Sequence, residues 1–122
     1  MSHATGNRLA EYALSEISDE LRTVTVLYED DYEIIYLRDD LQESYDPDLY
    51  KRVVDSFRVE MSDERHLEDE SSVGSKRATI HYHDNAYVFQ FPHDDCHSIL
   101  LSVVPSVGSQ LRSFINACEQ RL

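Results

Sequence analysis

Residues 76–104 read KRATIHYHDNAYVFQFPHDDCHSILLSVV and predict three consecutive antiparallel strands. The first two strands alternate side chains on either side of Asp84 and Asn85. This pair suits a tight hairpin turn, because asparagine tolerates the left-handed backbone that such a turn demands. Pairing across the turn sets Ile80 opposite Phe89 and gives the hairpin one aliphatic and aromatic face.

The third strand of this stretch, residues 98–104, is apolar at nearly every position. Such a run indicates a central strand that is covered on both faces. Upstream, residues 23–29 and 32–38 also alternate with a period of two and predict a second hairpin. A two-residue acidic turn at 30–31 would join them.

Three segments have the 3.6-residue period of amphipathic helices: 9–21, 47–61 and 106–122. The middle segment has the clearest start, because Asp46 is a suitable N-cap and a proline follows it. Cys118 lies on the apolar stripe of the last segment, which we expect to face the sheet and to belong to the core.

These elements predict a single α+β domain over residues 1–122, a length that suffices for an ordinary core. The expected fold is a five-stranded antiparallel sheet with helices on both faces, in the order α-β-β-α-β-β-β-α. We expect residues 1–7 to be disordered. Residues 62–75, rich in acids and serine, predict a mobile acidic linker between the second helix and the third strand.

The element order over about residues 8–122 resembles that of the roadblock domain and, more loosely, the profilin-like folds. Two segments, 21–41 (LRTVTVLYEDDYEIIYLRDDL) and 88–95 (VFQFPHDD), resemble a family of small uncharacterised haloarchaeal proteins. The roadblock resemblance implies that the first and last helices cover one face of the sheet and the middle helix the other. It also implies a homodimer that regulates or scaffolds a partner such as a small GTPase.

The composition is strongly acidic, with 24 Asp and Glu against 11 Lys and Arg and a formal charge of −13. Such a surface repels phosphates, so nucleic acid is not an expected partner. Only two of the eleven cations are lysine, and molar salt would screen the self-repulsion of the carboxylates. We therefore expect a halophilic protein, the alternative being an ordinary acidic mesophilic one.

The sequence shows no feature of a membrane-inserted or secreted protein. Neither a run of about 20 apolar residues nor a hydrophobic signal core is present, so we expect no membrane insertion and a cytoplasmic location. The two cysteines, Cys96 and Cys118, lie in different settings, which is typical of reduced thiols rather than a disulfide framework.

A candidate metal site lies at the corner between the second and third strands of the opening stretch. Its imidazole, carboxylate and thiolate groups suit zinc or another late divalent metal, and they are His93, Asp95, Cys96 and His97. His81 and His83 share one strand face but lie near the opposite end of the strands, so they cannot join the same site within one chain. The alternative is that all these histidines are solvated strand and loop residues.

Catalysis is not expected. The thiol of Cys96 lies beside two histidines, but Asp94 and Asp95 would raise its pKa rather than lower it. Three glycines in the whole chain leave no glycine-rich phosphate loop, and no acidic cluster has the spacing of a twelve-residue calcium loop. We expect neither an enzyme nor a resident cofactor, apart from the possible divalent metal.

An aromatic surface is the remaining candidate. The residues concerned lie in the second strand and at the start of the middle helix, and they are Tyr32, Ile34, Tyr36 and Tyr50. They either pack beneath that helix or form an interface, where aromatic residues are favoured. The expected function is a non-catalytic, homodimeric interaction or regulatory module, and the alternative is a sensor that binds a metal or small ligand at residues 93–97.

Overall fold

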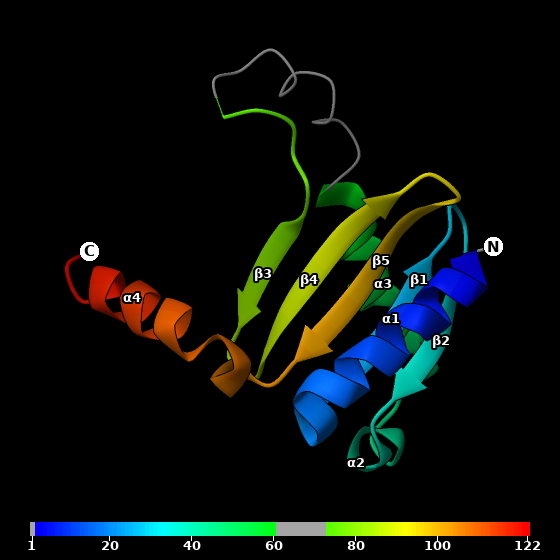
Figure 1. The fold of residues 1–122 in the computed structure, drawn as a ribbon, viewed down its shortest axis with the longest axis horizontal. Helices are drawn as coiled ribbons and strands as arrows, with labels where there is room; N and C mark the ends of the chain where they lie inside the picture. Colours follow the sequence, from blue (N-terminus) through cyan, green and yellow to red (C-terminus); the bar gives the residue numbers. More distant parts are fainter. Residues whose placement is uncertain (1, 61–72) are drawn as a thin grey trace.

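The computed structural model describes residues 2–60 and 73–122. One antiparallel sheet of five strands forms the centre, with α1 on one face and α3 on the other (Figure 1). The strands are β1 (Leu21–Leu27), β2 (Tyr32–Leu37), β3 (Thr79–His83), β4 (Ala86–His93) and β5 (Cys96–Val103). The helices are α1 (Ser2–Ile17), η1 (Ser18–Glu20), α2 (Asp39–Gln42), α3 (Pro47–Glu60), η3 (Pro105–Gly108) and α4 (Ser109–Glu119).

The sheet has the order β2-β1-β5-β4-β3, so β5 is its central strand as the apolar run predicted. Its side chains are buried from Ser98 to the end of the strand. The β3–β4 hairpin turns at residues 84–85, and Ile80 pairs with Phe89, also as predicted. Two hairpins therefore lie on either side of one buried strand, as expected of a central strand covered on both faces.

The hairpin of β1 and β2 has a longer turn than predicted. Leu27 pairs with Tyr32, so four residues make the connection rather than two. The turn is closed by a hydrogen bond from the amide of Tyr28 to the carbonyl of Asp31, and the carboxylate of Asp31 accepts the amide of Tyr32. Local capping of this kind by aspartate favours a longer turn over a tight primed one.

α1 begins at Ser2, where disorder was predicted for residues 1–7, and it ends before the predicted limit because Leu21 already belongs to β1. The buried residues nearest the sheet are small, namely Gly6, Ala10 and Ala13, and the larger Leu9, Leu14 and Ile17 pack around them half-buried. A Cβ at Gly6 would lie 2.9 Å from Cγ1 of Ile35. α1 thus approaches the sheet closely along a line of small residues that a search for large apolar side chains undervalues.

α3 starts as predicted. The carboxylate of Asp46 accepts hydrogen bonds from the amides of Asp48 (3.0 Å) and Leu49 (3.4 Å), and Pro47 occupies the first turn. This N-cap fixes the point where the helix begins. From there α3 packs Val54 and Phe57 onto the second face of the sheet.

α4 overturns the expectation that both terminal helices cover one face. It projects from the edge of the domain instead of lying on the sheet (Figure 1). Its stripe is open to solvent: Leu111 is 40% exposed, Phe114 68%, and Cys118, expected in the core, is exposed. Pro105 opens a 3-10 turn, and Gly108 packs against the ring of Tyr87, which directs the chain away from the strands.

The predicted acidic linker, residues 62–75, falls almost wholly outside the described residues. Within residues 2–60 and 73–122, none of the helices has the length and apolar character that crossing a bilayer requires.

Candidate functional site

The corner between β4 and β5 does not assemble the predicted metal ligands. His93 pairs with Cys96 across a turn at residues 94–95, and Nδ1 of His93 accepts the amide of Asp95 at 3.2 Å. The thiol of Cys96 donates to the carbonyl of Ser98. Among the described residues, no three histidine, cysteine, aspartate or glutamate side chains come together as a metal would need.

His97 turns away from this corner and joins a buried polar chain beneath α3. Its Nδ1 lies 3.0 Å from the hydroxyl of Ser98, which also accepts an N–H of Gln90 at 3.0 Å. The Gln90 amide nitrogen donates to the carbonyl of Phe57 as well, and its oxygen lies 2.9 Å from Nε2 of His81. Because that oxygen only accepts, His81 donates through Nε2.

In this series of polar contacts the histidines serve two structural purposes: they pack against Phe57 and they give buried polar groups hydrogen-bond partners. Gln90 and Ser98 are fully buried, and burying them would be costly without these partners. The ring of Phe57 contacts the rings of both His81 (4.6 Å between centroids) and His83 (6.1 Å). The two strand histidines therefore share a face, as predicted, and that face lies against α3.

The aromatic surface proposed from sequence divides between the two faces of the sheet. Tyr50 on α3 meets Tyr32 and Tyr45 edge to face, at centroid distances of 5.4 and 5.7 Å. Tyr36 instead packs with the cluster beneath α1. Ile34 is half-buried and pairs with Thr25. The four residues do not make one continuous surface.

The hydroxyls of Tyr32, Tyr45 and Tyr50 make hydrogen bonds within the protein. A hydrogen bond between the hydroxyls of Tyr32 and Tyr45 (3.0 Å), together with burial, raises the pKa of Tyr32 to about 12. Burial also raises the pKa of Tyr50, whose hydroxyl lies 2.6 Å from that of Thr25. These side chains have the satisfied hydroxyls and edge-to-face contacts of a core rather than of a free surface.

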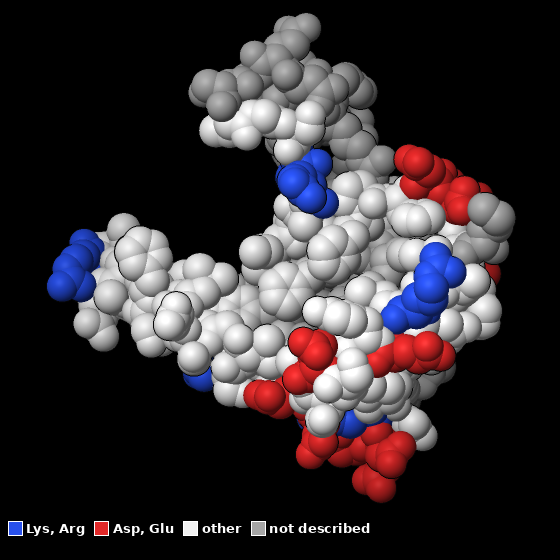
Figure 2. Space-filling view, viewed as in Figure 1, with Lys and Arg blue, Asp and Glu red and all other residues white. Residues whose placement is uncertain are grey.

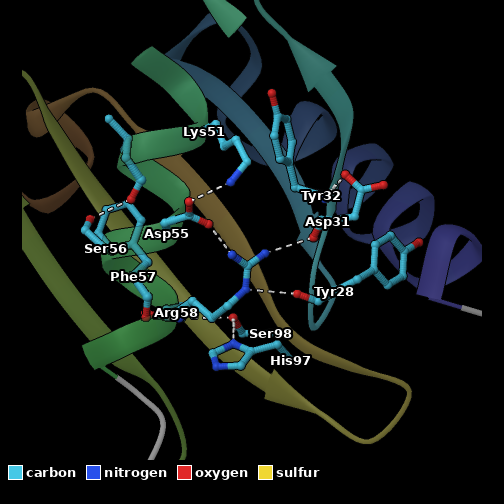
Figure 3. A network of polar contacts seen from close by, with 12 residues as sticks. Tyr28, Asp31, Tyr32, Lys51, Asp55, Ser56, Phe57, Arg58, His97 and Ser98 are labelled. Atoms are coloured by element: carbon cyan, nitrogen blue, oxygen red, sulfur yellow. Dashed lines mark hydrogen bonds and ion pairs between the residues drawn. The ribbon is translucent and has the colours of Figure 1, made fainter. Parts of the chain in front are cut away.

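Arg58 locks α3 to the turn between β1 and β2 (Figure 3). Its guanidinium donates to the carbonyls of Tyr28 (3.1 Å) and Asp31 (3.0 Å) and pairs with the carboxylate of Asp55. Asp55 also accepts the ammonium of Lys51 at 2.9 Å, and this bond and the pairing with Arg58 lower its pKa. This arrangement is structural, because the guanidinium of Arg58 is engaged by Tyr28, Asp31 and Asp55.

The uncovered half of the sheet is the most distinctive surface. α1 lies over β1 and β2, and on that face it leaves β3 and β4 open (Figure 1). The side chains on this part of the face, here called the β3–β4 strip, are Ile80, Tyr82, Phe89 and Phe91. Tyr82 and Phe89 are half-buried against the cluster beneath α1. Ile80 is 53% exposed and Phe91 37%. Apolar side chains that lie exposed side by side are common at contact surfaces.

The strip lies on the part of the sheet nearest α4 (Figure 1), and both surfaces carry few charges. Figure 2 shows mainly uncharged atoms between them, with Lys or Arg side chains at the margins, while acidic side chains gather over other parts of the molecule. β3 and β4 contain no acidic residue, and α4 contains one, Glu119. In a chain with a formal charge of −13, this is where another apolar surface meets the least repulsion.

One protein-family model matches residues 7–122, and its description is "Domain of unknown function (DUF7522)". Neither the curated proteins nor the solved structures include a match to the chain.

Proposed function

The chain belongs to the DUF7522 family, and we propose that it is a non-catalytic interaction module that forms a homodimer through the β3–β4 strip and α4. The observation that supports this proposal is that one chain carries an uncovered apolar sheet face and an uncovered amphipathic helix. Each surface needs a cover that the described residues of the same chain do not supply. A second copy would supply both.

The dimensions of the two surfaces match. α4 has 11 residues and is about 17 Å long, while β3 has five residues and is also about 17 Å long. A helix about 10 Å wide covers roughly two strands that are 4.8 Å apart. The open part of the sheet is therefore about one helix wide.

We infer a reciprocal exchange, in which α4 of each copy lies on the β3–β4 strip of the other. Such a contact is isologous and closes with two-fold symmetry, so it ends at a dimer. Leu111, Phe114 and Cys118 lie on one side of α4 at spacings of three and four residues. They would replace solvent over Ile80 and Phe91.

The setting of this module is proposed from composition and resemblance. The acidic excess and scarcity of lysine favour a halophilic cytoplasm. A regulatory role, with a small GTPase or another regulatory protein as partner, rests on the resemblance in element order to the roadblock domain alone.

Light scattering after size exclusion in molar KCl tests the homodimer. We expect the unaltered chain to elute as a dimer and both Phe114→Glu and Ile80→Glu to elute as monomers, because each places a carboxylate in the apolar contact. Tyr12→Glu is the matched control. Tyr12 is an aromatic residue on α1 with 64% exposure, close to the 68% of Phe114, and its replacement should leave the dimer intact.

Mixing the two monomeric variants separates reciprocal exchange from other dimers. The Ile80→Glu chain keeps an intact α4, and the Phe114→Glu chain keeps an intact strip, so the mixture should recover a heterodimer with one undamaged contact. Cys118 gives a second readout: in a Cys96→Ser background its thiol should react slowly in the dimer and rapidly in Phe114→Glu. The proposal would be overturned if the unaltered chain were a monomer, or if Phe114→Glu and Ile80→Glu both remained dimers.

A further inference from the structure

Two cavities open between α3 and the sheet, on the face opposite the β3–β4 strip. Their volumes are about 270 and 190 Å³, and both are lined by Arg22, Thr23, Tyr50 and Val53. They therefore form adjoining parts of one groove, here called the α3 groove, along the flank of the helix. Together they reach the size of small-ligand pockets, which begins at about 300 Å³.

The groove is mainly apolar, with Ser44 and Asp46 among the residues that line its smaller cavity and His83 among those that line the larger. The larger cavity places Val54, Phe57, Val88 and Leu100 along its walls. The hydroxyls of Thr23 and Ser102, which also line it, are 2.6 Å apart and satisfy each other. Arg22 is thus the lining side chain that brings a charge and several donors to both cavities.

A β-bulge aims Arg22 into the groove. Leu21 pairs with Val103 and Thr23 with Ser102, so Arg22 is an extra residue in the ladder between β1 and β5. Neighbouring residues of a regular strand point to opposite faces, yet Arg22 and Thr23 line the same two cavities. Bulges re-aim side chains in this way and are common beside binding sites.

The charge of Arg22 is only weakly compensated. Burial and the neighbouring Arg38 lower its pKa, and Asp40 acts in the opposite direction. The carboxylate of Asp40 is already engaged by Arg38 at 2.6 and 3.0 Å. Within the described part of the chain Arg22 forms no salt bridge. Asp46, which lines the smaller cavity with Arg22, accepts the first amides of α3. In a chain with an excess of 13 negative charges, a half-buried cation whose neighbouring carboxylates are engaged elsewhere points to an external anion.

We propose that the α3 groove binds a small amphipathic carboxylate. Its anionic end would pair with the guanidinium of Arg22, which suits a carboxylate in a bidentate contact. Its apolar body would lie against Val53, Phe57 and Leu100. This site is independent of the proposed homodimer, because it lies on the other face of the sheet.

Octanoate is a suitable probe because it has one carboxylate and an unbranched apolar body. Titration in molar KCl, followed by amide chemical shifts, should show saturable binding with shifts centred on α3 and the start of β1. Arg22→Gln should weaken octanoate binding about tenfold or more, since a charge-assisted contact is lost. Arg22→Lys, which keeps the charge without the planar fork, should recover part of the affinity.

Two controls keep the result specific. Arg52→Gln removes a cation from the exposed side of the same helix and should leave the affinity unchanged. 1-Octanol has the same apolar body without the charge, so it should bind more weakly than octanoate. Its affinity should be the same for Arg22→Gln and the unaltered chain. Equal octanoate affinity in Arg22→Gln and the parent chain, shifts confined to the β3–β4 strip, or no saturable binding would each overturn the proposal, whatever the oligomeric state.

Discussion

At the scale of single residues, two arginines that look alike in the sequence have opposite environments. Arg58 donates to two backbone carbonyls and pairs with Asp55, whereas Arg22 lines an apolar groove and forms no salt bridge with the described carboxylates. The first arrangement joins a helix to a turn. The second leaves donors available to a ligand.

Replacing Arg58 with alanine should lower the free energy of unfolding by about 2 kcal/mol, because two backbone carbonyls and the carboxylate of Asp55 lose a charged donor. Urea unfolding in molar KCl measures the change. Arg52→Ala is the matched control, as Arg52 is an exposed arginine on the same helix, and its effect should stay within about 0.5 kcal/mol. Equal effects of the two substitutions would mean that the network in Figure 3 adds nothing beyond net charge.

The buried polar chain through Gln90 belongs to the same scale. From the sequence we expected His81 and Gln90 on strands and His97 at the corner, and we excluded one metal site shared by His81 and that corner. Nothing in the sequence indicated that Ser98 would link the three side chains. The available signal was a glutamine within an otherwise apolar hairpin. A buried glutamine requires partners, although their identity depends on which strands become neighbours.

At the scale of elements, the apolar stripe of α1 packs against the sheet, whereas that of α4 does not. α1 lies close to the sheet because its most buried positions are small, and a Cβ at Gly6 would lie 2.9 and 3.0 Å from side-chain atoms of Ile35 and Val26. α4 follows a 3-10 turn that directs it outward. Amphipathic periodicity therefore predicts that a helix has an apolar face, and the connection decides what that face can reach.

Gly6→Leu should destabilise the domain by about 1–3 kcal/mol, the usual cost of overpacking, because the new side chain would have to displace α1 from β1 and β2. Thermal unfolding measured by circular dichroism checks this. Ala4→Leu on the exposed side of the same helix is the control, and it should be nearly neutral because alanine and leucine have similar helix propensities. Equal stability of Gly6→Leu and Ala4→Leu would show that the close approach is not required.

At the scale of the whole molecule, charge is distributed unevenly. The acidic excess avoids β3, β4 and most of α4, which leaves a surface of few charges between them on a strongly negative protein. Repulsion among carboxylates elsewhere opposes compaction and association alike. Salt should therefore favour both folding and the proposed dimer.

The melting temperature should rise between about 0.1 M and 1 M KCl, over which the Debye length falls from about 10 to 3 Å. A gain of about 2 kcal/mol would raise it by roughly 8 °C in a domain of this size. Sorbitol at equal osmolality is the control and should give a smaller rise, since it does not screen charge. A melting temperature independent of KCl would show that the acidic surface does not limit stability.

The fold class was determined by local patterns in the sequence. Alternation on either side of Asp84 and Asn85, the apolar run of β5 and the cap at Asp46 predicted strands, a hairpin and a helix start that the structure confirms. These signals are readable because each depends on backbone periodicity or on hydrogen bonds within a few residues.

The tertiary structure alone decided the sites. It divided Tyr32 from Tyr36, turned His97 away from Cys96, aimed Arg22 into a groove through a bulge and left α4 off the sheet. Each outcome depends on strand register or on the direction of a connection, and a shift of one residue sends a side chain to the opposite face. Composition and periodicity fix which side chains are apolar or charged, but only the packed sheet determines which of them meet.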